Sequence, residues 1–208
     1  MENMTLFDFE LKDYQGNEIP MDGDRKHILI NVASECGYTK NNYQELKLFL
    51  ETVGSEKVNV YLFPCDDFGG QEPGTMDEIK TFCDGFEVLM YPNVYLMDKV
   101  VLKDSPLWHW LQYTNEWVTK YGWDFEVKWN FHKYFVDENG EFWGFSYSYE
   151  NLNDDAVVEW VNTPIVTKEE REEILSEMIQ RDQEMGLYDE PIEIEGEIIG
   201  YVKKDEKE

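Results

Sequence analysis

The chain carries little positive charge and no long apolar run. Its 208 residues include 18 Lys and Arg against 45 Asp and Glu, which gives a net charge of −27. Nucleic acid and anionic membrane surfaces repel such a chain. A membrane-spanning helix needs roughly 18–20 consecutive apolar residues, and no stretch approaches that length. We therefore expect neither a nucleic-acid partner nor insertion into a membrane.

Cysteine and histidine are also scarce, with three of each. Three cysteines do not make a disulfide framework, and no C-x-x-C or H-x-x-x-H spacing indicates a structural zinc site. The first residues, Met1 to Met4, lack the basic start and apolar stretch of a signal peptide. We expect a cytoplasmic protein without a metal or other cofactor, whose cysteines matter, if at all, through their reactivity.

Apolar residues make up 42% of the chain, enough to bury a core and to exclude disorder throughout. Residues 6–20 alternate apolar and polar around Gly16, which predicts an N-terminal β-hairpin. Apolar runs then alternate with segments of helical periodicity. The first predicted helix has Thr39 or Asn41 as its cap and Gly54 at its end. The predicted elements are strands at 27–33, 58–63 and 94–97 and helices at 38–52, 75–83 and 108–118.

A second hairpin and a closing helix complete the main part of the chain. Residues 128–136 and 141–145 flank an Asn-Gly turn, a strong hairpin signal. Residues 152–161 have helical periodicity, with Asn151 or Asn153 as the predicted cap. Strands and helices that alternate in a chain of this size predict a layered α/β fold.

An acidic stretch follows Pro164. Residues 168–185 have the pattern of a charged amphipathic helix, and isoleucines around Gly196 predict one or two strands. Such a segment is too short for a core of its own. We therefore predict a main domain at 1–163 and an acidic appendage at 164–208. The appendage must pack on the main domain, pair with another chain or remain mobile.

Cys36 directly follows a predicted buried strand and precedes a predicted helix. Open α/β sheets place active sites at such strand ends, and the helix N-terminus favours a thiolate over a thiol. Gly37 leaves space for a substrate to approach. The layout resembles the thioredoxin fold, but Thr39 stands where a dithiol motif has its second cysteine. The alternative is an inert core cysteine, since cysteine is among the most buried residue types.

Other candidate residues are weaker when each is taken alone. Cys65 and Cys83 have the surroundings of core cysteines. Trp129 and Asn130 precede a strand, and Gln71 lies in a Gly-rich loop. Indole and amide N–H groups can donate to a thiolate or to a peroxide oxygen. Tryptophan is usually a core residue, however, and a loop glutamine is usually solvated.

Three segments together resemble the glutathione peroxidase family. They are NVASECGYT at 31–39, FPCDDFGGQEPG at 63–74 and KWNF at 128–131. One segment alone would be weak, but all three occur in the order and at a spacing similar to those of the family. The resemblance covers roughly residues 4 to 162 and leaves the acidic tail unmatched.

The resemblance implies a thioredoxin-like fold, with the N-terminal β-hairpin and the acidic C-terminal appendage added, and an enzyme that reduces hydroperoxides. It assigns Cys36 as the peroxidatic residue and Gln71, Trp129 and Asn130 as its polar partners. In this chemistry the thiolate attacks the terminal peroxide oxygen, and preorganised donors stabilise the departing oxygen. Cys36 becomes a sulfenic acid.

Cys83 is at the place of the second cysteine in the cysteine-containing, thioredoxin-dependent branch of the family. The resemblance therefore implies a Cys36–Cys83 disulfide that a thioredoxin-like partner reduces. A disulfide needs Cα atoms within ~7 Å of one another, so a packed helix around Cys83 must unfold locally. The alternative remains a core cysteine.

Several positions depart from the family pattern. Asp66 and Asp67 add negative charge near the site, and the segment between Val101 and Phe125 lacks the long loop of tetrameric relatives. We expect a monomer or a dimer. Three arginines at scattered positions form no cluster for glutathione carboxylates. The open alternatives are a glutathione-dependent one-cysteine peroxidase, a peroxide sensor that passes its disulfide to a client through the acidic tail, and an inactive thioredoxin-like module.

Overall fold

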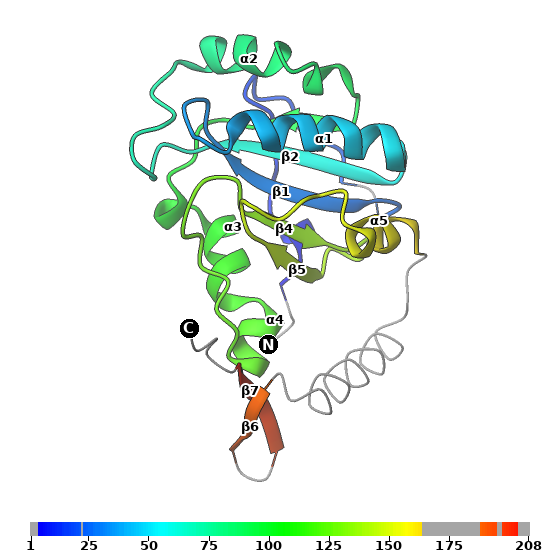
Figure 1. The fold of residues 1–208 in the computed structure, drawn as a ribbon, viewed down its shortest axis with the longest axis vertical. Coiled ribbons are helices and arrows are strands. Elements are labelled where there is room, and N and C mark those ends of the chain that lie inside the picture. Colours follow the sequence, from blue (N-terminus) through cyan, green and yellow to red (C-terminus); the bar gives the residue numbers. More distant parts are fainter. Residues whose placement is uncertain (1–3, 22, 164–187, 195–196, 204–208) are drawn as a thin grey trace.

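A computed structural model describes residues 4–21, 23–163, 188–194 and 197–203. Its centre is a five-stranded sheet in the order β3-β2-β1-β4-β5 (Figure 1). The three strands β1, β2 and β3 are parallel, whereas β4 is antiparallel to β1 and β5 to β4. The strands are β1 (Lys26–Val32), β2 (Val58–Pro64), β3 (Val94–Leu96), β4 (Lys133–Val136) and β5 (Phe142–Ser146). The predicted α/β architecture is confirmed.

Both faces of the sheet are covered, because β1 and β2 are buried at every position. Side chains alternate between two apolar cores, as strand geometry requires. Ile28 and Ile30 belong to one core, and Leu29 between them belongs to the other. The helices are α1 (Thr39–Val53), α2 (Met76–Asp84), α3 (Pro106–His109), α4 (Glu116–Tyr121) and α5 (Asp155–Asn162).

The helices divide between the two cores. Phe49 of α1, Ile79 of α2 and Trp160 of α5 pack in the core of Ile28 and Ile30. Trp108 of α3 packs in the other core. The π-helical turn η4 and three short 3-10 helices connect these elements, namely η1 (Leu6–Asp8), η2 (Val88–Met90), η3 (Leu102–Asp104) and η4 (Trp110–Thr114). Within the described part of the chain, no helix is long and apolar enough to cross a membrane.

The predicted N-terminal hairpin is present in a short form, over residues 11–19. Residues 6–8 form η1 instead of a strand, and a single antiparallel bridge joins Lys12 to Glu18. The Asp13 carboxylate accepts hydrogen bonds from the backbone N–H groups of Gln15 and Asn17, both at 2.9 Å. Backbone N–H groups of Asp13 and Ile19 donate to the carbonyls of Asn17 and Leu11, at 2.9 and 3.0 Å, on the two sides of the bridge. Local side-chain bonding thus closes a short hairpin.

Helix termini account for the other differences from the sequence-based expectations. Segment 108–118 is not one helix, because Asn115 has extended backbone and caps α4 with its side chain. Asp154 caps α5 in place of Asn151 or Asn153. Neither Thr39 nor Asn41 caps α1, whose N-cap residue is Tyr38, although Gly54 ends this helix as predicted.

The C-terminal segment is described in part. Two antiparallel strands, β6 (Tyr188–Ile194) and β7 (Glu197–Lys203), confirm the predicted strands around Gly196. The backbone of β7 lies close to α4 (Figure 1). The helix predicted at 168–185 lies outside the described residues.

Candidate active site

Cys36 lies in the loop between β1 and α1, beyond the carboxyl end of the strand, as predicted. The residue is 7% exposed. Its carbonyl oxygen accepts a hydrogen bond from the Thr39 N–H at 3.1 Å, and the Thr39 hydroxyl donates to the Ala33 carbonyl at 2.7 Å. These bonds hold the loop in a tight turn before α1. The first turn of α1 has no acidic side chain, so its positive end is free to favour an anion nearby.

The loop that carries Gln71 reaches the Cys36 loop through the backbone. The Glu35 N–H donates to the Gln71 carbonyl at 3.0 Å, one residue before Cys36. Gly69 and Gly70 turn the chain with φ values of 69° and 62°, which side-chain-bearing residues rarely adopt. Gln71 is therefore held beside the cysteine loop, although Gln71 and Cys36 are 35 positions apart in the sequence.

The two aspartates that depart from the family pattern hold backbone groups of nearby loops. An Asp66 carboxylate oxygen accepts from the Glu72 N–H at 2.7 Å, and Asp67 accepts from the Leu102 N–H at 2.8 Å. Each carboxylate therefore has a structural partner. These hydrogen bonds to backbone N–H groups explain why the loop accommodates two acidic residues.

Asn130 joins the same group of residues. Its Nδ2 donates to Gln71 Oε1 at 2.9 Å, and the Asn130 side chain is fully buried. Trp129 is 38% exposed, and its ring centroid lies 6.1 Å from that of Phe68 in the Gly-rich loop. The structure thus brings three distant segments, those of Cys36, Gln71 and Trp129–Asn130, to one edge of the sheet.

Cys83 lies inside α2 and is fully buried. Its sulfur lies 3.3 Å from the hydroxyl oxygen of Tyr43. Burial raises the pKa of the Cys83 thiol to about 11, and the nearby Glu72 carboxylate adds to this rise. Cys65 is buried too, and burial raises its pKa to about 12. All three cysteines are free thiols.

Known proteins match the chain over the region that holds these residues. The family model described as glutathione peroxidase matches residues 6–112, which include Cys36, Gln71 and Cys83. An Arabidopsis thaliana protein described as a probable mitochondrial phospholipid hydroperoxide glutathione peroxidase 6 is 37% identical over 145 residues, covering 67% of this chain and 59% of that protein. A probable phospholipid hydroperoxide glutathione peroxidase of Nicotiana sylvestris is 35% identical over 143 residues, covering 65% of this chain and 79% of that protein.

The chain belongs to the glutathione peroxidase family.

The match spans only 59% and 58% of the length of two Arabidopsis members of the family, the second of which is described as chloroplastic. Among solved structures, the one described as Trgpx in apo form has a TM-score of 0.54 at 25% identity, covering 77% of this chain and 97% of that one. The T. cruzi GPX1 structure has a TM-score of 0.55 at 19% identity and covers 78% of this chain and 100% of its own. A thioredoxin-family protein of Chlorobium tepidum has a TM-score of 0.52 at 11% identity, covering 74% of this chain and 93% of that one. These likenesses confirm the thioredoxin-like fold.

Within this family member, three buried polar residues near the site were not singled out from the sequence. They are Asn31 in β1, Glu72 beside Gln71, and Lys133 in β4. Burial raises the pKa of the Glu72 carboxyl group. For Asn31 the sequence does carry a signal, a polar residue inside an apolar strand. Such a residue indicates buried hydrogen-bond partners, because a polar group is costly to bury without them. Lys133 gave no such signal, since lysine is common on the exposed face of a hairpin strand.

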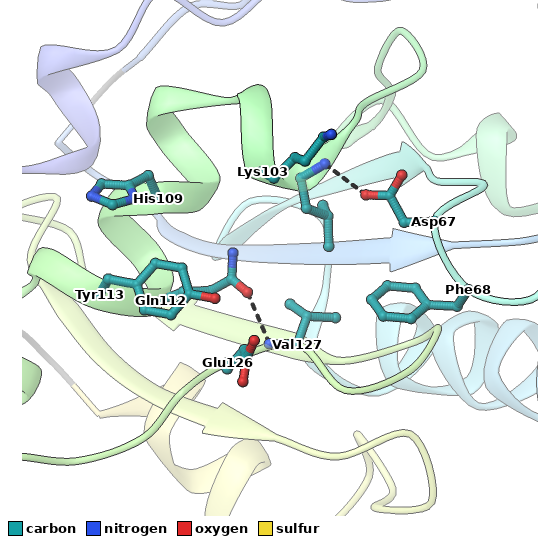
Figure 2. Close-up of a pocket in the computed structure, with 9 residues that line it drawn as sticks. Asp67, Phe68, Lys103, His109, Gln112, Tyr113, Glu126 and Val127 are labelled. Carbon is teal, nitrogen blue, oxygen red and sulfur yellow. Dashed lines mark hydrogen bonds between the residues drawn. The ribbon is translucent and has the colours of Figure 1, made fainter.

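A pocket of about 460 Å³ borders the Gly-rich loop (Figure 2). Phe68 lies on its wall and also contacts the Trp129 ring. Figure 2 shows the Gln112 side chain bonded to the backbone N–H of Val127, at 2.9 Å, on another side of the pocket. The pocket therefore lies next to the Trp129 side of the site, and Cys36 is not among the residues that line it.

Proposed function

We propose that this glutathione peroxidase family member reduces hydroperoxides with Cys36 as the peroxidatic residue. The Asn130–Gln71 hydrogen bond carries the proposal, because it joins two predicted partners beside the Cys36 loop. The bond occupies Gln71 Oε1 and leaves the hydrogens on its Nε2 to serve as donors. In the reaction the Cys36 thiolate attacks the terminal peroxide oxygen and the O–O bond breaks. An S–O bond forms, so Cys36 becomes a sulfenic acid. The amide and indole N–H groups of Gln71, Asn130 and Trp129 stabilise the departing hydroxide or alkoxide, which takes up the equivalent of the proton lost by the Cys36 thiol and leaves as water or an alcohol.

The proposal assigns Cys83 as the resolving residue. Its sulfur attacks the sulfenic sulfur of Cys36, a disulfide forms, and the hydroxyl group leaves as water with the thiol proton. Cys83 is a free thiol in a helix that follows the Gly-rich loop, which supports this role. Because the thiol is fully buried, α2 must open locally before the sulfurs meet.

A thioredoxin-like protein is the proposed reductant, in preference to glutathione. Glutathione carries two carboxylates, which arginine binds best. Arg25 precedes β1, whereas Cys36 lies beyond the other end of that strand, and Arg25 already bonds to Asn59. Arg171 and Arg181 lie outside the described residues. The net charge of −27 also disfavours a small anionic reductant.

Peroxide turnover coupled to thioredoxin or to glutathione tests this mechanism. Cys36→Ser should abolish turnover with both reductants, and Cys83→Ser should stop after one turnover with thioredoxin. Cys65→Ser is the matched control, because Cys65 is an equally buried free thiol without a role in the proposal. Normal cycling of Cys83→Ser with thioredoxin would exclude the two-cysteine mechanism, and faster turnover with glutathione would favour the one-cysteine alternative.

The wider organisation of the protein is part of the same proposal. We assign residues 1–163 as the peroxidase domain and 164–208 as an acidic appendage, in a chain that acts as a monomer or dimer in the cytoplasm. The free cysteines support a reducing compartment. Two relatives are described as mitochondrial and chloroplastic, so cell fractionation is the direct test of location. Light scattering before and after deletion of 167–208 tests the oligomeric state.

A further inference from the structure

The segment that carries Trp129 and Asn130, residues 129–132, has an unusual backbone. It precedes β4 and belongs to no helix or strand. Phe131 has a φ of 65°, in the left-handed region that a bulky aromatic residue rarely occupies. Its side chain is almost fully buried. A strained backbone of this kind persists only where surrounding contacts fix it.

Asn31 of β1 fixes this segment from one side. Its Nδ2 donates to the Trp129 carbonyl at 3.0 Å, and its Oδ1 accepts from the His132 N–H at 2.9 Å. The backbone carbonyl of Asn31 accepts from the Phe131 N–H at 2.6 Å. The side chain is fully buried, so these bonds form away from water. The strand that leads to Cys36 thus also holds the segment of its proposed partners.

Lys133 fixes the same segment from the other side. Its Nζ donates to the carbonyl oxygens of Phe131, Tyr147 and Glu150, at 3.3, 3.1 and 3.0 Å. The lysine is 1% exposed, and a buried ammonium group is costly unless its donors are satisfied. Ser148, in the loop after β5, adds a bond from its hydroxyl to the Asn130 carbonyl at 2.6 Å.

We propose that Asn31 and Lys133 are positioning residues of the peroxidase site, which hold residues 129–132 so that the Asn130 amide meets Gln71 and the Trp129 ring stays against Phe68. The inference rests on the proposed function of Cys36. Neither residue touches the reacting atoms. Asn31 acts through backbone bonds on both sides of Asn130, and Lys133 acts through the Phe131 carbonyl and the loop after β5. Loss of either therefore releases the donors that stabilise the departing oxygen.

The chain supplies a matched control for each position. Asn93 is also fully buried, and its Nδ2 donates to a carbonyl, that of Val58 at the start of β2. Lys26 at the start of β1 is another buried lysine, whose Nζ donates to the carbonyls of Trp160 and Thr163. Both controls lie where the strands begin, at the opposite end of the sheet from Cys36. The controls therefore test the loss of a similar bond without a change at the site.

The experiment measures two second-order rate constants for the Cys36 sulfur, one for oxidation by hydrogen peroxide and one for alkylation by iodoacetamide. The ratio of the oxidation constant to the alkylation constant should fall tenfold or more in Asn31→Asp and in Lys133→Met. It should stay within twofold of the wild-type ratio in Asn93→Asp and Lys26→Met. A merely structural role would change the target and control variants alike. Ser148→Ala is the mild variant, with an expected threefold fall in the ratio if the stronger variants do not fold.

The outcomes separate the inference from the function on which it rests. A wild-type Cys36 that reacts with peroxide no faster than a free cysteine would refute the proposed function, and the positioning role with it. A reactive wild type with an unchanged ratio in the folded Asn31, Lys133 and Ser148 variants would refute the positioning role alone. Equal falls in the target and control variants would also overturn it.

Discussion

The hydroxyl oxygen of Tyr43 lies 3.3 Å from the sulfur of Cys83, and this contact joins α1 to α2 inside the core. The Tyr43 ring stacks on Phe86 with centroids 4.9 Å apart and meets Phe131 edge-on at 5.9 Å. The proposed resolving sulfur is thus held by an aromatic cluster that also supports the segment of Asn130. Attack on Cys36 requires this contact to break first.

Tyr43→Phe removes the hydroxyl and keeps the ring. We expect a loss of about 1 kcal/mol in the free energy of unfolding, as for a typical hydrogen bond. Disulfide formation between Cys36 and Cys83 should become severalfold faster after one equivalent of peroxide, because opening of α2 loses one restraint. Stopped-flow fluorescence with mass mapping measures this rate. Tyr91→Phe is the control, since its hydroxyl bonds to Glu51 at the surface. A slower reaction would mean that the Tyr43 hydroxyl activates the thiol instead of restraining it.

The three cysteines should differ in their reaction with iodoacetamide. Cys36 is 7% exposed, whereas Cys65 and Cys83 are fully buried with pKa values of about 12 and about 11. At pH 8 a thiol with a pKa of 11 is ionised in about one molecule in a thousand. Native protein should therefore be alkylated at Cys36 first, as read from peptide masses. Under denaturing conditions all three should react alike. Equal rates at Cys36 and Cys83 in native protein would show that α2 is already open.

Local patterns were enough to predict where Cys36 lies. A buried apolar run followed by a Gly-containing turn and a periodic helix specifies a strand end next to a helix start, and these features depend on neighbouring residues only. The turn at Asn139–Gly140 was predictable for the same reason, and Gly140 does adopt a φ of 76°. For these two turns, local sequence patterns were sufficient.

Contacts between distant segments could not be predicted from local patterns. The Asn130–Gln71 bond joins residues 59 positions apart, and only the family resemblance placed them together. Lys133 lies in a hairpin strand where alternation favours an exposed lysine, but two of its acceptors come from a loop 14 and 17 residues later. The break before α4 is instead a local effect that apolar periodicity does not reveal, because capping by Asn115 competes with the helix.

Acid should destabilise the fold through His27. This residue is fully buried with Nδ1 2.9 Å from the Tyr61 hydroxyl, and burial lowers its pKa from 6.5 to about 4. Between these values the unfolded chain binds a proton that the folded protein does not. The free energy of unfolding should therefore fall as the pH drops from 6.5 towards 4, by up to about 3 kcal/mol for His27. His132, whose pKa is also about 4, should act in the same direction.

Urea unfolding at several pH values measures this effect. His27→Gln should flatten the dependence of stability on pH over this range, since one group with a shifted pKa is removed. His109→Gln is the control, because His109 is exposed. An unchanged pH dependence in folded His27→Gln would show that His27 is not the group responsible.

Two glycines with similar φ values allow the cost of backbone strain to be measured apart from the cost of steric overlap. Gly16 and Gly140 have φ values of +83° and +76°. A Cβ at Gly16 meets no atom within 4 Å, whereas a Cβ at Gly140 lies 2.9 Å from the Phe7 ring. Gly16→Ala should lower the free energy of unfolding by about 1 kcal/mol through backbone strain alone. Gly140→Ala should cost about 1 kcal/mol more, because the Leu6 N–H bonds to the Gly140 carbonyl at 2.7 Å and limits how far the segment of Phe7 can move. If urea unfolding gives the same loss in the free energy of unfolding for both variants, the half-exposed Phe7 ring moves aside freely.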